Sequence, residues 1–75
     1  MIEYTIFTYG ACGHQLLEGG QLNTCFVYGW CKAPSAEAAR IYATNIFHKA
    51  NPKADLASVE VKASPELALI NKKLN

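Results

Sequence analysis

The residues that could do chemistry begin with Cys12 and His14, a thiol and an imidazole two positions apart in the segment Gly10-Ala11-Cys12-Gly13-His14. A cysteine nucleophile also needs an oriented base and an oxyanion donor. Zinc sites usually show paired ligands of the form C-x2-C or H-x3-H, and neither spacing occurs here. We therefore keep a zinc-binding or reactive-thiol site centred on Cys12 and His14 as an alternative hypothesis. Folding could add Cys25, Cys31 and His48 to it.

Other signatures of catalysis are weak or missing. The run Trp30-Cys31-Lys32-Ala33-Pro34 resembles the redox turn of thioredoxin-like proteins only locally, because Pro34 stands where that motif has its second cysteine. The sequence has no phosphate loop, Ser-His-Asp set or dinucleotide fingerprint. Its 75 residues also leave little volume for a pocket. We therefore expect that the protein is not an enzyme and that it binds no cofactor, resident metal or small-molecule substrate.

An aromatic row is the most unusual feature of the sequence. Phe26, Tyr28 and Trp30 alternate along one segment, so in a strand they would share one face. Three interpretations stay open: a second small core beneath a final helix, a protein–protein interface, or a base-stacking platform. We add Tyr9 and Ile41 as candidate partner-binding residues. Ile41 is included because it is an apolar residue on the polar side of the predicted helix.

Composition favours an interaction protein over a nucleic-acid binder. About half the residues (51%) are apolar and 17% are charged, below the usual ~25%. The net charge is +1 and the basic residues are scattered, which argues against nucleic-acid binding. We expect a protein partner or a homo-oligomer and no membrane contact. An odd count of three cysteines and the lack of a secretion signal indicate the cytoplasm of the cell or of an infected host.

Periodicity predicts a single α+β domain over residues 1–75. The first strand is dense in β-branched and aromatic residues, and a connection of about a dozen residues punctuated by Gly10, Gly13, Gly19 and Gly20 follows it. The helix begins after the capping residue Ser35 and ends at Asn51-Pro52. The predicted elements are strands at 2–9, 23–32 and 56–63, a helix at 36–50, and a short C-terminal helix starting at Ser64-Pro65-Glu66.

The order of these elements constrains the topology. Consecutive strands pair antiparallel, and a right-handed crossover through the helix brings the third strand beside the first. The prediction is a three-stranded antiparallel ββαβ sheet, order 2-1-3, with the helix on one face. We expect the alanine-rich helix to cover Cys25, Val27, Gly29 and Cys31 together with Val59 and Val61, leaving the aromatic row on the far face.

The strand that runs through Ala33-Pro34-Ser35-Ala36-Glu37-Ala38-Ala39 into a helix and a third strand resembles a recurrent small module. It is similar in outline to short phage-encoded proteins, including some anti-CRISPR inhibitors, and to small ribosomal and phycobilisome-linker domains. The similarity covers about residues 2–63 and transfers no functional residue. Our leading hypothesis is a small non-enzymatic inhibitor, adaptor or assembly subunit that acts through its aromatic sheet face or a sheet edge. One form of this hypothesis is a phage-encoded protein of anti-defence type.

Overall fold

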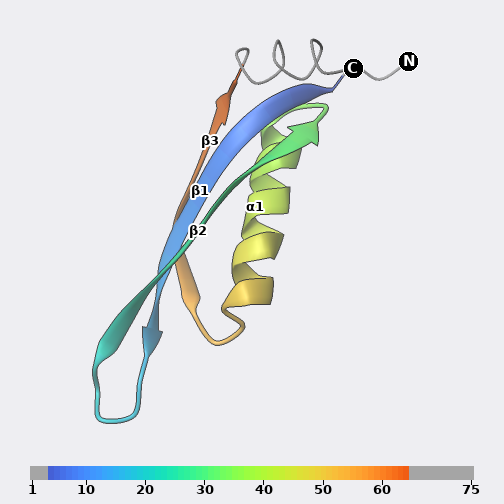
Figure 1. The fold of residues 1–75 in the computed structure, drawn as a ribbon. Helices are drawn as coiled ribbons and strands as arrows, with labels where there is room; N and C mark the ends of the chain where they lie inside the picture. The colour runs from blue at the N-terminus through green and yellow to red at the C-terminus, as the bar shows by residue number, and fades with distance from the viewer. Residues whose placement is uncertain (1–3, 65–75) are drawn as a thin grey trace.

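The protein folds as a three-stranded antiparallel sheet with one helix packed across one face, as predicted (Figure 1). The computed structural model describes residues 4–64. The sheet order is β2-β1-β3. Its elements are β1 (Thr5–Leu16), β2 (Leu22–Ala33), α1 (Ala36–Ala50) and β3 (Asp55–Ala63). The predicted C-terminal helix lies outside the described residues.

The hairpin of β1 and β2 is longer than predicted, and its connection is correspondingly short. Gly10 and Gly13 lie inside β1, so the predicted glycine-rich loop after residue 9 is wrong. The turn occupies residues 17–21, where the Leu17 amide donates to the Gln21 carbonyl (2.7 Å) and the Gly20 amide to the Leu17 carbonyl (3.1 Å). Gly19 and Gly20 have φ values of 91° and 85°, a region that side chains disfavour. Only these two glycines therefore serve as turn residues.

Helix α1 has the bounds that its caps predict. The Ser35 hydroxyl accepts a hydrogen bond from the Ala38 amide (3.1 Å) and so satisfies one free donor of the first turn. At the other end the Asn51 amide donates to the Phe47 carbonyl (2.8 Å). The buried stripe of α1 consists of Ala39, Ala43 and Phe47.

The core lies between α1 and the sheet and forms two clusters. One gathers around Phe7, Cys31 and Ala39, and the other around Ala11, Cys25 and Phe47. Val61 packs against the first cluster and Val59 and Leu56 against the second. Leu56 faces inward as well as Val59 because a bulge in β3 places Ala57 between the partners of Cys12 and Gly13. The predicted positions of Cys25, Cys31, Val59 and Val61 under the helix are confirmed.

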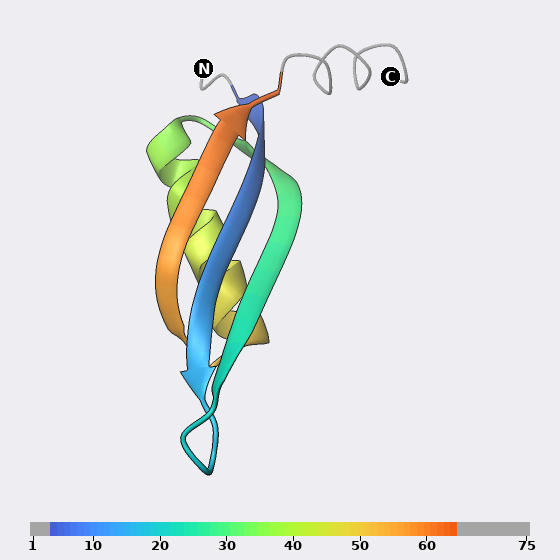
Figure 2. The same ribbon diagram turned by 90° about the vertical axis from the view of Figure 1, so that its left-hand side faces the viewer.

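The end of the β1–β2 hairpin extends past α1 (Figures 1 and 2). In Figure 2 the three strands lie in front and α1 lies behind them, so α1, the helix of residues 4–64, covers only one face of the sheet. We call the side of the sheet opposite α1 the open face.

Candidate functional site

The open face consists of three columns of side chains, one from each strand. Because directly paired residues of an antiparallel sheet project to the same side, the register defines these columns. On β1, Thr8 lies opposite Trp30 of β2 and Lys62 of β3. The next two rows are Tyr28, Gly10 and Glu60, then Phe26, Cys12 and Ser58. The face therefore has an aromatic column on β2, a column of small residues on β1, and a polar column on β3.

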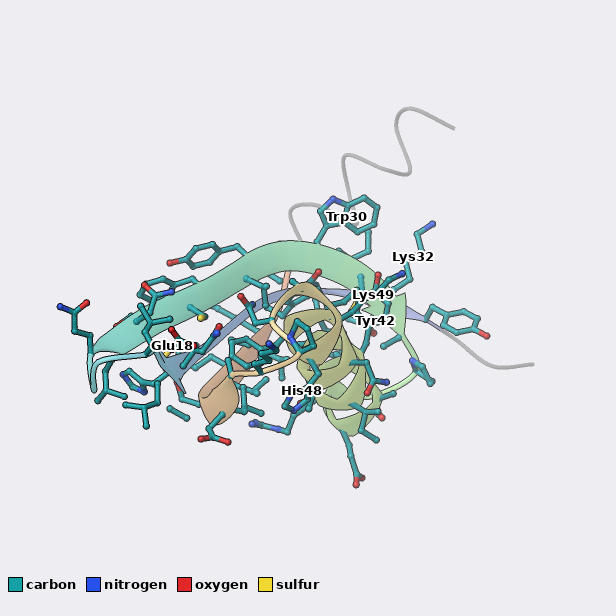
Figure 3. The ribbon with its side chains drawn as sticks, turned by 90° about the horizontal axis from the view of Figure 1, so that it is seen from below. Glu18, Trp30, Lys32, Tyr42, His48 and Lys49 are labelled. Atoms are coloured by element: carbon teal, nitrogen blue, oxygen red, sulfur yellow. The ribbon has the colours of Figure 1, made fainter. Side chains whose placement is uncertain are left out.

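The aromatic column is exposed along its whole length. The exposed fractions of Phe26, Tyr28 and Trp30 are 56%, 77% and 58%. The rings of Phe26 and Tyr28 are stacked, with centroids 6.0 Å apart and planes 7° from parallel. Figure 3 shows Trp30 projecting from the sheet on the side away from α1. The prediction that this row occupies the far face is confirmed.

A shallow groove follows the small residues of β1. Gly10 and Cys12 form its floor, Phe26 and Tyr28 one wall, and Ser58 and Glu60 the other. The Cys12 thiol lies 3.3 Å from the Ser58 hydroxyl, within hydrogen-bond distance. An apolar wall, a floor of small residues and a polar wall give the groove two chemically different sides.

Tyr9 does not lie with the aromatic column, although we grouped it with the partner-binding residues. It pairs with Gly29 and therefore faces the helix, where its ring meets Tyr42 edge to face (centroids 5.8 Å apart). A Cβ at position 29 would collide with the Tyr9 ring, so Gly29 provides the space for it. Burial first, then the neighbouring Tyr42 and Cys31, raise the pKa of Tyr9. Tyr9 is a half-buried packing residue.

Ile41 is exposed to a similar extent, 57%, but lies on α1. The helix covers the opposite face of the sheet from the aromatic column, so the structure does not bring Ile41 together with Phe26, Tyr28 or Trp30. Any partner contact at Ile41 would use a different side of the molecule.

The candidate cysteine and histidine residues divide between the two faces of the sheet. Cys12 and His14 lie on β1 and not in a loop, whereas Cys25 and Cys31 are buried on the helix side. Burial raises the pKa of the Cys31 thiol. In the described part of the chain, no three His, Cys, Asp or Glu side chains group in a way that could hold a metal ion.

Sequence reasoning missed three residues of the open face, Leu16, Leu22 and Lys62. Leu16 and Leu22 pair at the hairpin end and are both exposed. Lys32 is two residues from Trp30 on β2, and Lys62 lies on β3, across Thr8 from Trp30, so both cations share the open face with this indole. The apolar residues on both sides of Gly19-Gly20 were a usable signal for the leucines. Lys62 required the register of β3, which its alternation alone does not fix.

Within residues 4–64, no helix has the length and apolar character needed to cross a membrane. No protein-family model matches the sequence, and neither the curated proteins nor the solved structures contain a significant match.

Proposed function

We propose that this protein is a non-enzymatic interaction module that binds a partner protein through the aromatic column of its open face. The observation that carries the proposal is the exposure of Phe26, Tyr28 and Trp30, each more than half exposed, side by side on one strand. Soluble domains rarely leave large aromatic side chains together in water without a binding role. Trp and Tyr are also the residue types that most often dominate the binding energy of protein interfaces.

The remaining residues of the open face support the same proposal. The centre of the face is uncharged, because Thr8, Gly10 and Cys12 lie there, and the charges of Lys32, Glu60 and Lys62 lie at its margins. An apolar centre with a charged rim keeps the desolvation of charges low when a partner binds. The small residues of β1 also leave room for a side chain of the partner beside Tyr28.

Aromatic truncation tests this proposal directly. We expect Tyr28→Ser and Trp30→Ser to weaken capture of the partner from the cells that make this protein about 30-fold each, since hot-spot residues contribute 2 kcal/mol or more. Ile41→Ser is the matched control, because Ile41 is as exposed as Trp30 but lies on α1. Capture that survives both aromatic substitutions, in variants with unchanged circular dichroism, would reject the open face as the binding surface.

Cys12 offers a second measurement on the same face. It is the least buried of the three free cysteines and lies in the floor of the groove, beside Phe26 and Tyr28. We expect the captured partner to slow alkylation of Cys12 by iodoacetamide, because a partner seated on the aromatic column covers the groove. The same titration also tests the alternative of a reactive thiol, which would alkylate much faster than a free cysteine at the same pH.

Single-stranded nucleic acid is a second candidate ligand, favoured by two cations on the same face as Trp30. Lys32 lies two residues from Trp30 on β2, Lys62 lies across Thr8 on the same face, and exposed aromatic rings on a sheet can stack with bases. Quenching of Trp30 fluorescence by an oligonucleotide at low salt, lost steeply as salt rises, would support this candidate over a protein partner. The acid of Glu60 on the same face opposes it.

The size and surface of the domain fit an inhibitor, an adaptor or an assembly subunit, including one of phage-encoded anti-defence type. Three free cysteines fit a reducing compartment, such as the cytoplasm of the cell or of an infected host.

A further inference from the structure

In the described part of the chain, the two edges of the sheet differ in whether a side chain of α1 bonds to them. β3 forms one edge and β2 the other. The Arg40 side chain of α1 reaches β3 and donates from Nη1 to the Val59 carbonyl oxygen (2.8 Å). No comparable side-chain hydrogen bond to the β2 edge occurs within residues 4–64, although β2 is twelve residues long. A long, unprotected edge strand is a template for a further strand.

The hydrogen-bond pattern identifies which residues of β2 present free backbone groups. Successive residues of an antiparallel strand direct their N–H and C=O to opposite neighbours. The Ser64 amide donates to the Ile6 carbonyl oxygen (2.8 Å), so Ile6 and every second residue after it bond to β3. Phe7, Tyr9 and Ala11 therefore bond to β2, through Cys31, Gly29 and Val27.

The residues between those partners must direct their backbone groups outward, to the free edge of β2. They are Thr24, Phe26, Tyr28, Trp30 and Lys32. The same alternation places the Val59 carbonyl on the free edge of β3, which is where Arg40 meets it. That contact independently supports the assignment of the pattern.

We infer that a second copy of this chain pairs with the β2 edge, antiparallel and about a two-fold axis at Tyr28, to form a continuous six-stranded sheet. In this register Tyr28 lies opposite the partner's Tyr28, and Phe26 lies opposite the partner's Trp30. Five outward residues on each strand then exchange about ten backbone hydrogen bonds. The inference goes beyond the proposed function, because it uses the strand edge and leaves the aromatic side chains on the open face.

Charge and side-chain pairing favour this register over its neighbours. Lys32 is the one charged residue in β2. With the axis at Tyr28 it lies opposite the partner's Thr24, so the two lysines are at opposite ends of the interface. Every aromatic residue of the column also lies opposite an aromatic residue, a favourable cross-strand pair. Moving the register by one pair places Trp30 opposite the partner's Thr24 or Phe26 opposite the partner's Lys32.

The helices leave room for this arrangement. Helix α1 packs across all three strands, so its axis lies close to β1. Three strand spacings, about 14 Å, then separate the two helices. Packed helices need 8–10 Å between axes, so the edges can meet without a clash.

Opposite charges placed at residue 24 test both the edge and the register. Thr24→Glu sets a carboxylate opposite the partner's Lys32, twice per dimer, and Thr24→Lys sets an ammonium there. From the size of cross-strand charge pairs we expect dimer dissociation constants at least about fivefold apart, with the Glu variant tighter and the difference shrinking in high salt. Sedimentation equilibrium measures these constants. Ser58→Glu and Ser58→Lys are the matched controls, because Ser58 shares the open face but lies on β3.

Cross-linking of the native cysteines gives an independent measurement of the register. With the axis at Tyr28, Cys25 lies opposite the partner's Cys31 in a pair that is not hydrogen-bonded, with Cα atoms about 4.5 Å apart. That separation lies within the disulfide range of about 4.4–6.8 Å. In a Cys12→Ala background, we expect diamide to cross-link a mixture of Cys25→Ser and Cys31→Ser chains but neither variant alone. The diamide is reduced and takes up the two protons and two electrons that the thiols lose.

The outcomes separate this inference from the proposed function. A chain that stays monomeric at millimolar concentration, or equal dissociation constants for the two Thr24 variants, would overturn the edge pairing. A dimer whose mixed cysteine variants fail to cross-link would overturn the register. All of these measurements use purified protein with an intact aromatic column, so they do not depend on capture of the partner.

Discussion

At the scale of single residues, three glycines of the sheet have different structural roles. Gly13 and Gly29 face the helix, and each leaves space for one ring: Phe47 lies against Gly13 and Tyr9 against Gly29. Gly10 faces the other way, into the groove of the open face, where an added Cβ would make ordinary contacts with the Tyr28 ring at 3.6 and 3.8 Å. The same residue type therefore supports packing at two positions and leaves a binding groove empty at the third.

This difference predicts opposite effects of two identical substitutions. A Cβ at Gly13 would collide with the Asp55 backbone and with the Phe47 ring, so we expect Gly13→Ala to lower the free energy of unfolding by about 1–3 kcal/mol. Gly10→Ala is the matched control. It has room for the methyl group and lacks a positive φ, so we expect it to be neutral or up to about 1 kcal/mol stabilising.

Urea denaturation of the two glycine variants measures both effects under the same conditions. Equal losses of stability in the two variants would contradict the close approach of Phe47 and Asp55 to Gly13.

At the scale of elements, the sequence predicted what caps and alternation determine. The helix bounds follow from Ser35 and Asn51-Pro52, and the strand order follows from the crossover, so both predictions are confirmed. The ends of β1 could not be predicted, because Gly10 and Gly13 were interpreted as breakers. Their actual role depends on partners distant in the sequence, Tyr28 for Gly10 and Phe47 for Gly13.

Of the candidate site, too, one part could be predicted from the sequence and another could not. The alternation of Phe26, Tyr28 and Trp30 fixes their common face from the sequence alone. The face of the sheet to which Tyr9 projects depends on which residue of β2 it pairs with. The length of the turn at residues 17–21 sets that register. A loop predicted at about a dozen residues gave no register, so Tyr9 could not be assigned to a face.

Arg40 links two elements, because its guanidinium group holds α1 to the outer edge of β3. We expect Arg40→Ala to lower the free energy of unfolding by about 0.5–1 kcal/mol, a small value because the contact is exposed to water. Arg40→Lys keeps the charge but loses the planar donor group, and we expect an intermediate loss. Urea denaturation measures both. An Arg40→Ala variant as stable as the native chain would show that this contact does not hold α1 to β3.

At the scale of the whole molecule, the core is small and made mostly of small side chains. Its two clusters contain Ala11, Ala33, Ala39 and Ala54 beside two cysteines and two phenylalanines. Phe47 is the largest side chain that is fully buried in the described part of the chain. A domain of this size gains only about 3–5 kcal/mol from such a core, and one large side chain therefore decides whether the chain folds.

Phe47 thus sets the stability limit of the molecule. Phe47→Ala removes a ring that packs against Gly13 on β1 and faces Cys25 of β2, and core Phe→Ala substitutions cost about 3–5 kcal/mol. That loss equals the expected total, so we predict an unfolded chain at 25 °C, seen as loss of the circular dichroism of α1 and collapse of amide proton dispersion. Phe47→Leu keeps most of the volume and should cost less than about 1.5 kcal/mol, leaving a folded protein with a lower melting temperature. A folded Phe47→Ala variant would mean that the domain holds stability from another source, and pairing of two chains along β2 is the first to examine, by repeating the melt over a range of protein concentrations.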